Sequence, residues 1–139
     1  MADLQANKDL ATRWINLISD GDVDAMSRLI TSSWRMYGGP PGLPSGPEGL
    51  RVLFATIGPI DQKWTIDDVV AEGDRVVVRA TCSCEQESFF GVPARGTRQV
   101  FTATFTFRIE DGLVAKVWRN ADDLGRLLQL GARIEPGSG

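Results

Sequence analysis

Residues 75–88 read RVVVRATCSCEQES, and apolar and polar side chains alternate along most of this stretch. Successive side chains on a β-strand point to opposite faces, so the stretch predicts a strand with one apolar and one polar face. The apolar face carries Val76, Val78, Ala80, Cys82 and Cys84. The polar face carries Arg79, Thr81, Ser83 and Glu85.

Three further strands are predicted around this one. They are residues 63–72, KWTIDDVVAE, residues 98–110, RQVFTATFTFRIE, and residues 113–120, LVAKVWRN. EGDR at 72–75 and EDGL at 110–113 have the residue types of hairpin turns. The strands that these turns join are therefore expected to run antiparallel.

The first third of the chain and its end predict helices. Apolar residues at helical spacing predict one helix over residues 8–19, a short one capped by Asp22, and one opened by a capping box of Ser45 and Glu48. Residues 31–37 predict a strand, and residues 122–130 predict a last short helix with an aspartate cap. Helices followed by antiparallel strands indicate an α+β fold, in one domain of residues 1–139, with the helices on one face of a curved sheet.

The composition argues against several classes of protein. The chain has 139 residues, of which 42% are hydrophobic and 24% charged, as is typical of one globular domain. A net charge of −3 argues against nucleic acid and anionic membranes as partners. Because the start, MADLQANKDL, is polar and no apolar run approaches the roughly 20 residues of a membrane span, a cytoplasmic protein is expected.

Histidine is absent from the sequence, which excludes every mechanism that needs an imidazole base and removes the commonest metal ligand. An acid or base must therefore be a carboxylate, a tyrosine, a lysine, a thiol or water. Cys82 and Cys84 are two residues apart on a strand, and an extended strand does not close so short a disulfide loop. Both are predicted to be free, buried and apolar in character.

Three segments carry a resemblance to a known family: FFGVPARGTRQV at 89–100, FTFRIEDGLVAKVW at 105–118 and DDLGRLLQLG at 122–131. They resemble the SnoaL-like polyketide cyclases of the nuclear transport factor two-like superfamily. The resemblance implies a cone-shaped α+β barrel, in which a curved antiparallel sheet wraps around three helices and a short C-terminal helix. It also implies an apolar cavity that binds a polycyclic aromatic polyketide without a metal or a bound organic cofactor.

The chain departs from the ring-closing members of this family. Those members are similar to one another in a histidine at the position of Glu85 and an aspartate near Phe105, and this chain has neither. A sub-branch with the same fold hydroxylates the anthracycline skeleton at carbon one together with a reductase partner. Resemblance to that sub-branch implies a hydroxylase of antibiotic biosynthesis with molecular oxygen as co-substrate.

Alternatives remain open at this point. A cyclase could close a ring by aldol condensation with Glu85 and Asp122 as its acid and base, and a carrier could bind hydrophobic ligands in the same cone without catalysis. Epoxide hydrolases of the superfamily use an arginine and two aspartates. Here Arg79 is followed two residues later by Thr81 and not by a carboxylate, which argues against that class.

The candidate catalytic residues are Glu85, Asp122 and Arg79. Each also has an ordinary structural interpretation: Glu85 as a strand-end carboxylate in water, Asp122 as the cap of the last helix, and Arg79 as half of an ion pair. Arg119 is a weaker candidate, and alternation places it on the opposite face of its strand from Trp118. The candidate substrate-binding residues are Trp34, Tyr37, Ser83, Phe90, Phe105 and Trp118.

The polar face of residues 75–88 is expected to line the cavity. The apolar strip with the two thiols would then lie outside and be buried in a second subunit, so a homodimer through sheet packing is expected.

Overall fold

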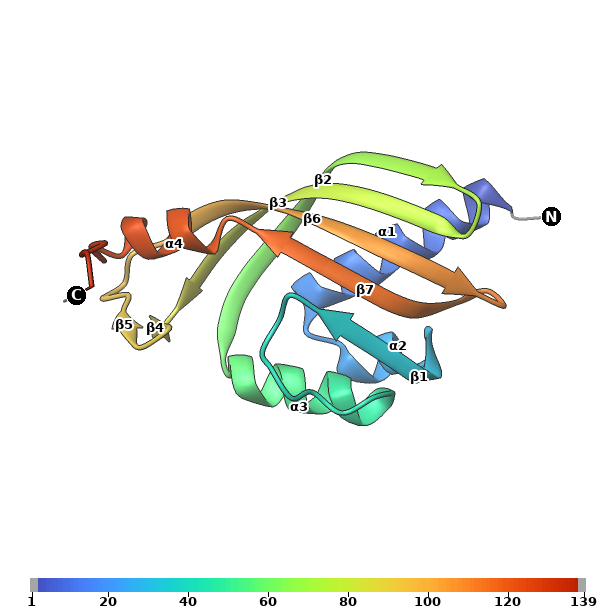
Figure 1. Ribbon diagram of the computed structural model, residues 1–139, viewed down its shortest axis with the longest axis horizontal. Coiled ribbons are helices and arrows are strands. Elements are labelled where there is room, and N and C mark those ends of the chain that lie inside the picture. Colours follow the sequence, from blue (N-terminus) through green and yellow to red (C-terminus); the bar gives the residue numbers. More distant parts are fainter. Residues whose placement is uncertain (1–2, 138–139) are drawn as a thin grey trace.

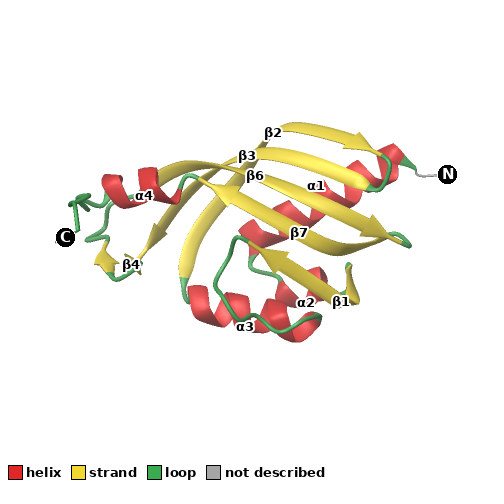
Figure 2. Cartoon of the chain, viewed as in Figure 1, coloured by secondary structure: helices red, strands yellow, loops and turns green. Residues whose placement is uncertain are grey.

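The structure is a computed structural model that describes residues 3–137. In this range it has four helices and seven strands, arranged in chain order as in Figures 1 and 2. The helices are α1 (Leu4–Asp20), α2 (Val23–Ser27), α3 (Pro47–Ile57) and α4 (Asp123–Gln129). The strands are β1 (Ile30–Tyr37), β2 (Ile60–Glu72), β3 (Arg75–Gln86), β4 (Ser88–Phe89), β5 (Val92–Pro93), β6 (Gln99–Glu110) and β7 (Leu113–Ala121). The predicted α+β fold is confirmed.

Five strands form one strongly curved sheet in the order β1-β7-β6-β3-β2 (Figure 1). The pairs among β7, β6, β3 and β2 are antiparallel as predicted, whereas β1 pairs with β7 in parallel, which makes the sheet mixed. Helix α1 packs against β2 and β3 along the concave side, and β4 and β5 form a separate two-stranded ribbon. None of the helices within residues 3–137 is long and apolar enough to cross a membrane.

The two faces of β3 are assigned by burial. Val76, Val78, Ala80, Cys82 and Cys84 are completely buried on the concave side, which we call the inner face of the sheet. Arg79, Thr81, Ser83 and Glu85 lie on the opposite, outer face, where they are half-buried or exposed. The prediction that the polar face lines the interior is therefore wrong. Burial of an apolar side chain stabilises the fold by roughly 1.5–3 kcal/mol, so the apolar strip faces the core.

The thiols are free and buried, as predicted, but they point into the chain's own core and not outward. The apolar strip consequently provides no surface for a second subunit. A homodimer remains a prediction, but the apolar strip cannot form its interface, because the strip is part of the chain's own core.

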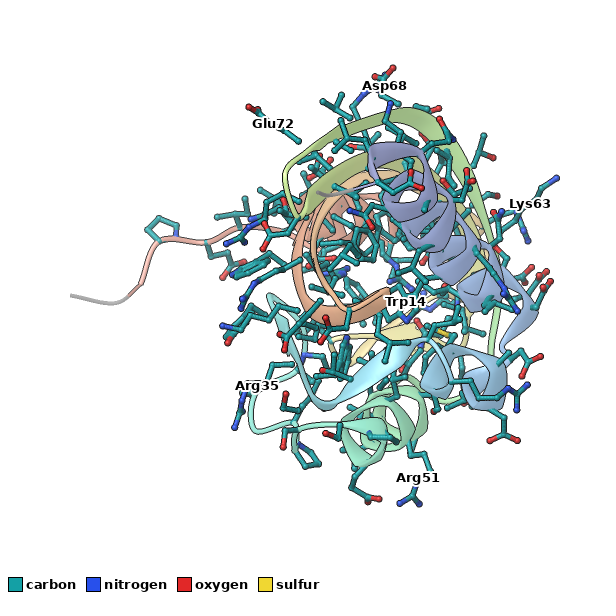
Figure 3. All side chains as sticks on the ribbon, turned by 90° about the vertical axis from the view of Figure 1, so that its right-hand side faces the viewer. Trp14, Arg35, Arg51, Lys63, Asp68 and Glu72 are labelled. Atoms are coloured by element: carbon teal, nitrogen blue, oxygen red, sulfur yellow. The ribbon has the colours of Figure 1, made fainter. Side chains whose placement is uncertain are left out.

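Large aromatic side chains fill the core between the sheet and the helices. The rings of Trp14 and Trp34 lie 6.2 Å apart, and Trp14 meets Phe107 edge to face at 5.6 Å. Figure 3 shows Trp14 inside the curve of the sheet, whereas the labelled charged residues point outward. These rings are part of the hydrophobic core inside the curved sheet.

Two of the three predicted helix caps agree with the structure, whereas α1 begins at Leu4, four residues before the predicted start. Asp22 caps α2, and Asp122 caps α4 by accepting from Gly125 N at 2.9 Å. The predicted capping box of Ser45 and Glu48 is wrong, because α3 begins after Gly46 without a side-chain cap. Gly46 donates to the Trp34 carbonyl at 2.8 Å, and a Cβ there would collide with the Ser32 carbonyl.

Candidate functional site

A cavity of about 480 Å³ lies between the inner face of the sheet and the helices. Its size is in the range of small-molecule sites, which are typically apolar with a few polar groups. The apolar lining comes from α1, α3 and the sheet, and includes Trp14, Ile18, Leu53, Phe54, Ile57, Trp64, Phe101 and Phe105. An aromatic ligand of several rings fits such a space.

Trp64 on β2 forms a flat wall of this cavity. Its ring meets Phe101 and Phe105 edge to face, at centroid distances of 5.6 and 5.2 Å. Its Nε1–H donates to Gln62 Oε1 at 3.0 Å, so the polar atom of the indole is satisfied by the protein. Aromatic rings held in fixed positions favour stacking against a planar ligand.

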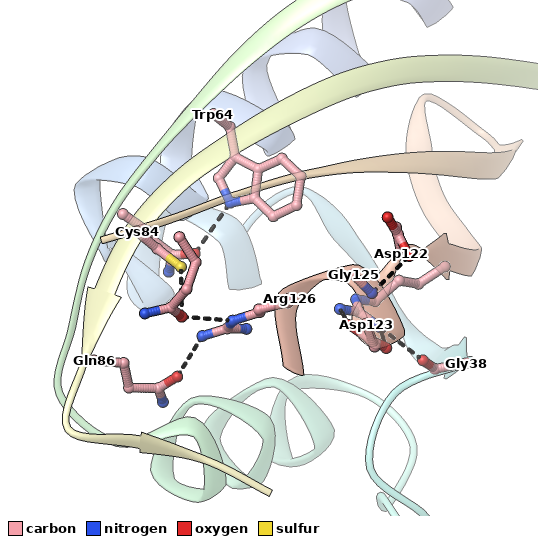
Figure 4. Close-up of polar contacts among 11 residues, drawn as sticks. Gly38, Trp64, Cys84, Gln86, Asp122, Asp123, Gly125 and Arg126 are labelled. Atoms are coloured by element: carbon pink, nitrogen blue, oxygen red, sulfur yellow. Dashed lines mark hydrogen bonds and ion pairs between the residues drawn. The ribbon is translucent and has the colours of Figure 1, made fainter. Parts of the chain in front are cut away.

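Arg126 on α4 brings a charge to the cavity wall (Figure 4). It is only 4% exposed. Its Nε donates to Gln99 Oε1 at 3.0 Å, its Nη2 donates to Gln86 Oε1 at 2.6 Å, and the guanidinium lies 3.7 Å above the ring of Phe89. Among residues 3–137, no carboxylate lies within 4.0 Å of it. Burial lowers the pKa of Arg126, yet a guanidinium keeps its charge at neutral pH.

The two glutamines that hold Arg126 are themselves fixed by the backbone. Gln86 Nε2 donates to the Ile57 carbonyl at 2.6 Å, and Gln99 Nε2 donates to the Thr97 carbonyl at 2.5 Å. Each amide therefore turns its oxygen toward the guanidinium. The position of Arg126 is thus set by β3, β6 and α3 together.

Cys84 belongs to the same network, because its thiol donates to Gln99 Oε1 at 3.8 Å. The neighbouring Cys82 and the charge of Arg126 lower the pKa of Cys84, whereas Cys84 and burial raise the pKa of Cys82. The pKa of Cys84 is lowered to about 7, so Cys84 is the more acidic of the two thiols and lies in the same buried network as Arg126.

Asp123 is the one carboxylate among the described residues that line the cavity. It receives two hydrogen bonds from Arg119, at 2.9 Å from Nη1 and 2.8 Å from Nη2. Arg119 Nη1 also donates to the Gly38 carbonyl at 3.2 Å. A Cβ at Gly38 would collide with the Arg119 backbone, so glycine permits this close approach of the loop after β1 to β7.

The chain folds in a way that groups these charges. Helix α4 starts directly after β7, and the side chains of Asp123 and Arg126, three residues apart, lie on the same side of the helix. Within the described part of the chain, no cluster of three His, Cys, Asp or Glu residues could hold a metal ion. The cavity therefore offers two guanidinium groups, one carboxylate and apolar walls.

The three predicted catalytic residues do not come together at this cavity. Glu85 lies on the outer face, with its carboxylate 3.9 Å from Arg98, and the prediction that it points into the interior is wrong. Arg79 is also outside and binds Asp68 through its Nε at 2.8 Å, which raises the pKa of Arg79. Asp122 is exposed and caps α4. All three have the structural roles that the sequence left open as alternatives.

The predicted substrate-binding residues divide into two groups. Phe90 and Phe105 line the cavity. Tyr37 and Trp118 stack on each other at 5.4 Å and do not line it, and Ser83 accepts a hydrogen bond from Arg98 on the outer face.

Trp34 is completely buried behind Trp14 and does not line the cavity either. Arg119 and Trp118 do lie on opposite faces of β7, as predicted, and the arginine is the one that faces inward.

The sequence interpretation missed Arg126, Asp123 and the two glutamines. A signal was present in α4, because positions 123, 126, 127 and 130 have the spacing of one buried helix stripe. Charged residues at two of these four positions indicate charges that turn toward the interior.

Comparison with known proteins gives this cavity a context. The family described as SnoaL-like domain matches residues 11–117. The solved structure of TsrD from Streptomyces laurentii is 32% identical, with a TM-score of 0.81, over 96% of this chain and 100% of that one. IdmH from Streptomyces antibioticus, a proposed polyketide cyclase, is 25% identical, with a TM-score of 0.74, over 91% of this chain and 99% of that one.

AclR from Streptomyces galilaeus, a proposed hydroxylase, has the same fold, with a TM-score of 0.80 at 20% identity over 96% of this chain and 89% of that one. A search of curated proteins found no match.

Proposed function

Because this chain belongs to the family of SnoaL-like domains, we propose that it is an enzyme that hydroxylates a polycyclic aromatic polyketide with molecular oxygen. The observation that carries the proposal is Asp123, a carboxylate at the wall of an apolar cavity, aligned by two hydrogen bonds from Arg119. It gives a chain without histidine a base at the ligand site. The description of IdmH as a proposed polyketide cyclase supports a polyketide as the substrate, and that of AclR as a proposed hydroxylase is compatible with hydroxylation.

In the proposed reaction, Asp123 takes a proton from a phenol, or from a carbon next to a carbonyl group, of the bound substrate. A carboxylate has about four lone-pair positions, and the two bonds from Arg119 leave others free for this proton. The guanidinium groups stabilise the resulting substrate anion, because the apolar walls keep water away and strengthen the electrostatic attraction. The proposal requires no metal ion or organic cofactor.

The electron-rich anion then reacts with dioxygen at a ring carbon. A quinone substrate that has first received two electrons and two protons adds one dioxygen molecule to form a carbon-bound hydroperoxide. Loss of water from the hydroperoxide gives the hydroxylated quinone. The net reaction consumes the quinone, two electrons, two protons and dioxygen, and gives the hydroxyquinone and water. A separate reductase partner supplies the electrons.

Ring closure is the second candidate, and the 25% identity with IdmH favours it. The same anion would attack a carbonyl carbon of the same molecule, and the new alkoxide would take up a proton. This reaction consumes no dioxygen and no electrons.

The two candidates are separated by dioxygen. The protein is incubated with a chemically reduced anthracyclinone under air, under nitrogen and under isotopically labelled dioxygen, with enzyme-free samples as the control for spontaneous oxidation. The proposal predicts a hydroxylated product that carries the label and forms faster than in the control. A product that forms equally well under strict nitrogen would contradict hydroxylation and support ring closure. A ligand that binds and is never converted would contradict both reactions and support a non-catalytic carrier.

A further inference from the structure

Arg126 has an unusual position for a charged side chain. It is 4% exposed, it lies on the inward stripe of α4, and the part of the chain that the structure describes gives it no carboxylate partner within 4.0 Å. Leaving a buried charge without a counter-charge is strongly unfavourable, and buried charges in proteins are normally paired. Its guanidinium contacts two neutral amide oxygens and the ring of Phe89, and it can therefore bind an anion that enters the cavity.

The hydrogen-bond count of Arg126 shows which atoms remain available. A guanidinium has five N–H groups, of which one on Nε and one on Nη2 donate to the two glutamines. Five minus two leaves three N–H groups, two of them on Nη1, without a protein acceptor in residues 3–137.

Nη1 is also open to the cavity. The side-chain nitrogen and oxygen atoms that are both sealed from solvent and without a partner within residues 3–137 are Trp14 Nε1, Thr31 Oγ1 and Trp34 Nε1. Nη1 of Arg126 also has no partner there, but it is not sealed from solvent. It therefore retains access to the space that Arg126 lines. The free donors can therefore reach a ligand.

The charge balance of the cavity agrees with this. Two guanidinium groups, from Arg119 and Arg126, face one carboxylate from Asp123, which leaves one positive charge in excess. Arg119 and Asp123 neutralise each other through two hydrogen bonds. The excess charge is therefore that of Arg126.

We propose that the ligand of this cavity is an aromatic carboxylic acid whose carboxylate binds Arg126 and whose rings lie against Trp64, Phe101 and Phe105. A carboxylate is planar and presents two oxygens, which matches two N–H groups of a guanidinium. Its single charge cancels the excess charge of the cavity. The assignment rests on the proposed function only in naming this ligand as the substrate class.

The test compares two ligands of the same ring system and nearly the same shape, the charged anthraquinone-2-carboxylate and the neutral anthraquinone-2-carboxamide. Their dissociation constants are measured by calorimetry and by quenching of tryptophan fluorescence. The wild-type protein is expected to bind the acid about tenfold more tightly than the amide, or better, because truncating one partner of a buried charged pair has an effect of at least this size.

The variant Arg126→Met removes the charge and keeps most of the side-chain length. It is expected to bind the acid and the amide equally, whereas Arg126→Lys keeps part of the preference. Arg98→Met is the matched control, because it removes a guanidinium that pairs with Asp61 on the outer face, and it should keep the full preference.

Equal binding of acid and amide by the wild-type protein would overturn the proposal, and so would an acid preference that survives in Arg126→Met. The wild-type comparison decides even where Arg126→Met fails to fold. Failure of the proposed function gives a different result. A strong preference for the acid without any turnover would contradict the proposed hydroxylase and support the carboxylate site at Arg126. Turnover of neutral polyketides without a preference for the acid would support the enzyme and contradict the carboxylate site.

Discussion

Replacing Asp123 with asparagine removes the proposed base and keeps the shape of the side chain. General-base catalysis contributes about 10²–10⁴-fold to a rate, so turnover by Asp123→Asn should fall by about that factor. The substitution also weakens the bidentate contact with Arg119, whose side chain is 17% exposed while that of Asp123 is 31% exposed.

The stability change follows from the same contact. A hydrogen bond to a charged group is worth about 1.5–3 kcal/mol, asparagine can still accept one, and partial exposure reduces the value. A loss of about 1–2 kcal/mol is therefore expected, which corresponds to a fall in Tm of about 3–8 °C for a chain of this size. Initial rates and thermal unfolding followed by circular dichroism measure the two effects.

Asp122→Asn is the matched control, because it makes the same chemical change one residue earlier. Asp122 caps α4, and asparagine is as good an N-cap as aspartate, so this variant should keep both its Tm and its rate. The assignment of the base would be refuted by a folded Asp123→Asn protein that keeps its rate within about threefold, a loss far below what removal of a general base causes. An equal loss in Asp122→Asn would refute it as well.

Three further outcomes are expected from the burial of particular residues. A thiol reagent should modify neither Cys82 nor Cys84 in the native protein and both after denaturation, because both are completely buried; rapid native modification would contradict the inner-face assignment. Asp122→Ala should lower the free energy of unfolding by about 1 kcal/mol, because it removes the side chain that caps α4; an unchanged Tm would contradict this. Glu85→Gln should leave turnover within about twofold, because Glu85 lies on the outer face and surface substitutions have small effects; a tenfold loss would contradict the placement of the active site at the inner-face cavity.

The strands and turns could be predicted because they depend on neighbouring residues. The alternation in residues 75–88 and the glycines at 73 and 112 act over a few positions, and the structure has β3, β6 and β7 with ends within two residues of those expected. The parallel pairing of β1 with β7 could not be predicted in this way. It joins segments about 80 residues apart in the chain, such as Tyr37 and Trp118, and no local pattern specifies that pairing.

The orientation of β3 was predicted wrongly for a physical reason. The alternation separated the two faces correctly, and the family resemblance then placed Glu85 inside. Turning Glu85 inward would have turned Cys82 and Val78 outward, and a one-residue change of register moves every side chain of a strand to the other face. The hydrophobic effect acts on the whole strip and outweighs the position of one carboxylate.

The candidate site was only partly predictable from the sequence. Of the aromatic residues named from the sequence, Phe90 and Phe105 line the cavity, and their binding of a substrate stays a prediction. Asp123 was passed over in favour of its neighbour. Asp122 and Asp123 are adjacent residues of the same type, so the sequence does not distinguish them. The orientation of α4 about its axis decides which one caps the helix and which one faces the cavity. Arg126 can be identified from the sequence by its place at the helical spacing of positions 123, 126, 127 and 130 in α4.

The structure of the complex with anthraquinone-2-carboxylate tests the location of the site and the role of Arg126 together. The account predicts that the ligand lies inside the inner-face cavity, with a carboxylate oxygen about 3 Å from Nη1 of Arg126 and its rings against Trp64. A ligand bound on the outer face beside Glu85, or one whose carboxylate points away from Arg126 toward solvent, would contradict it.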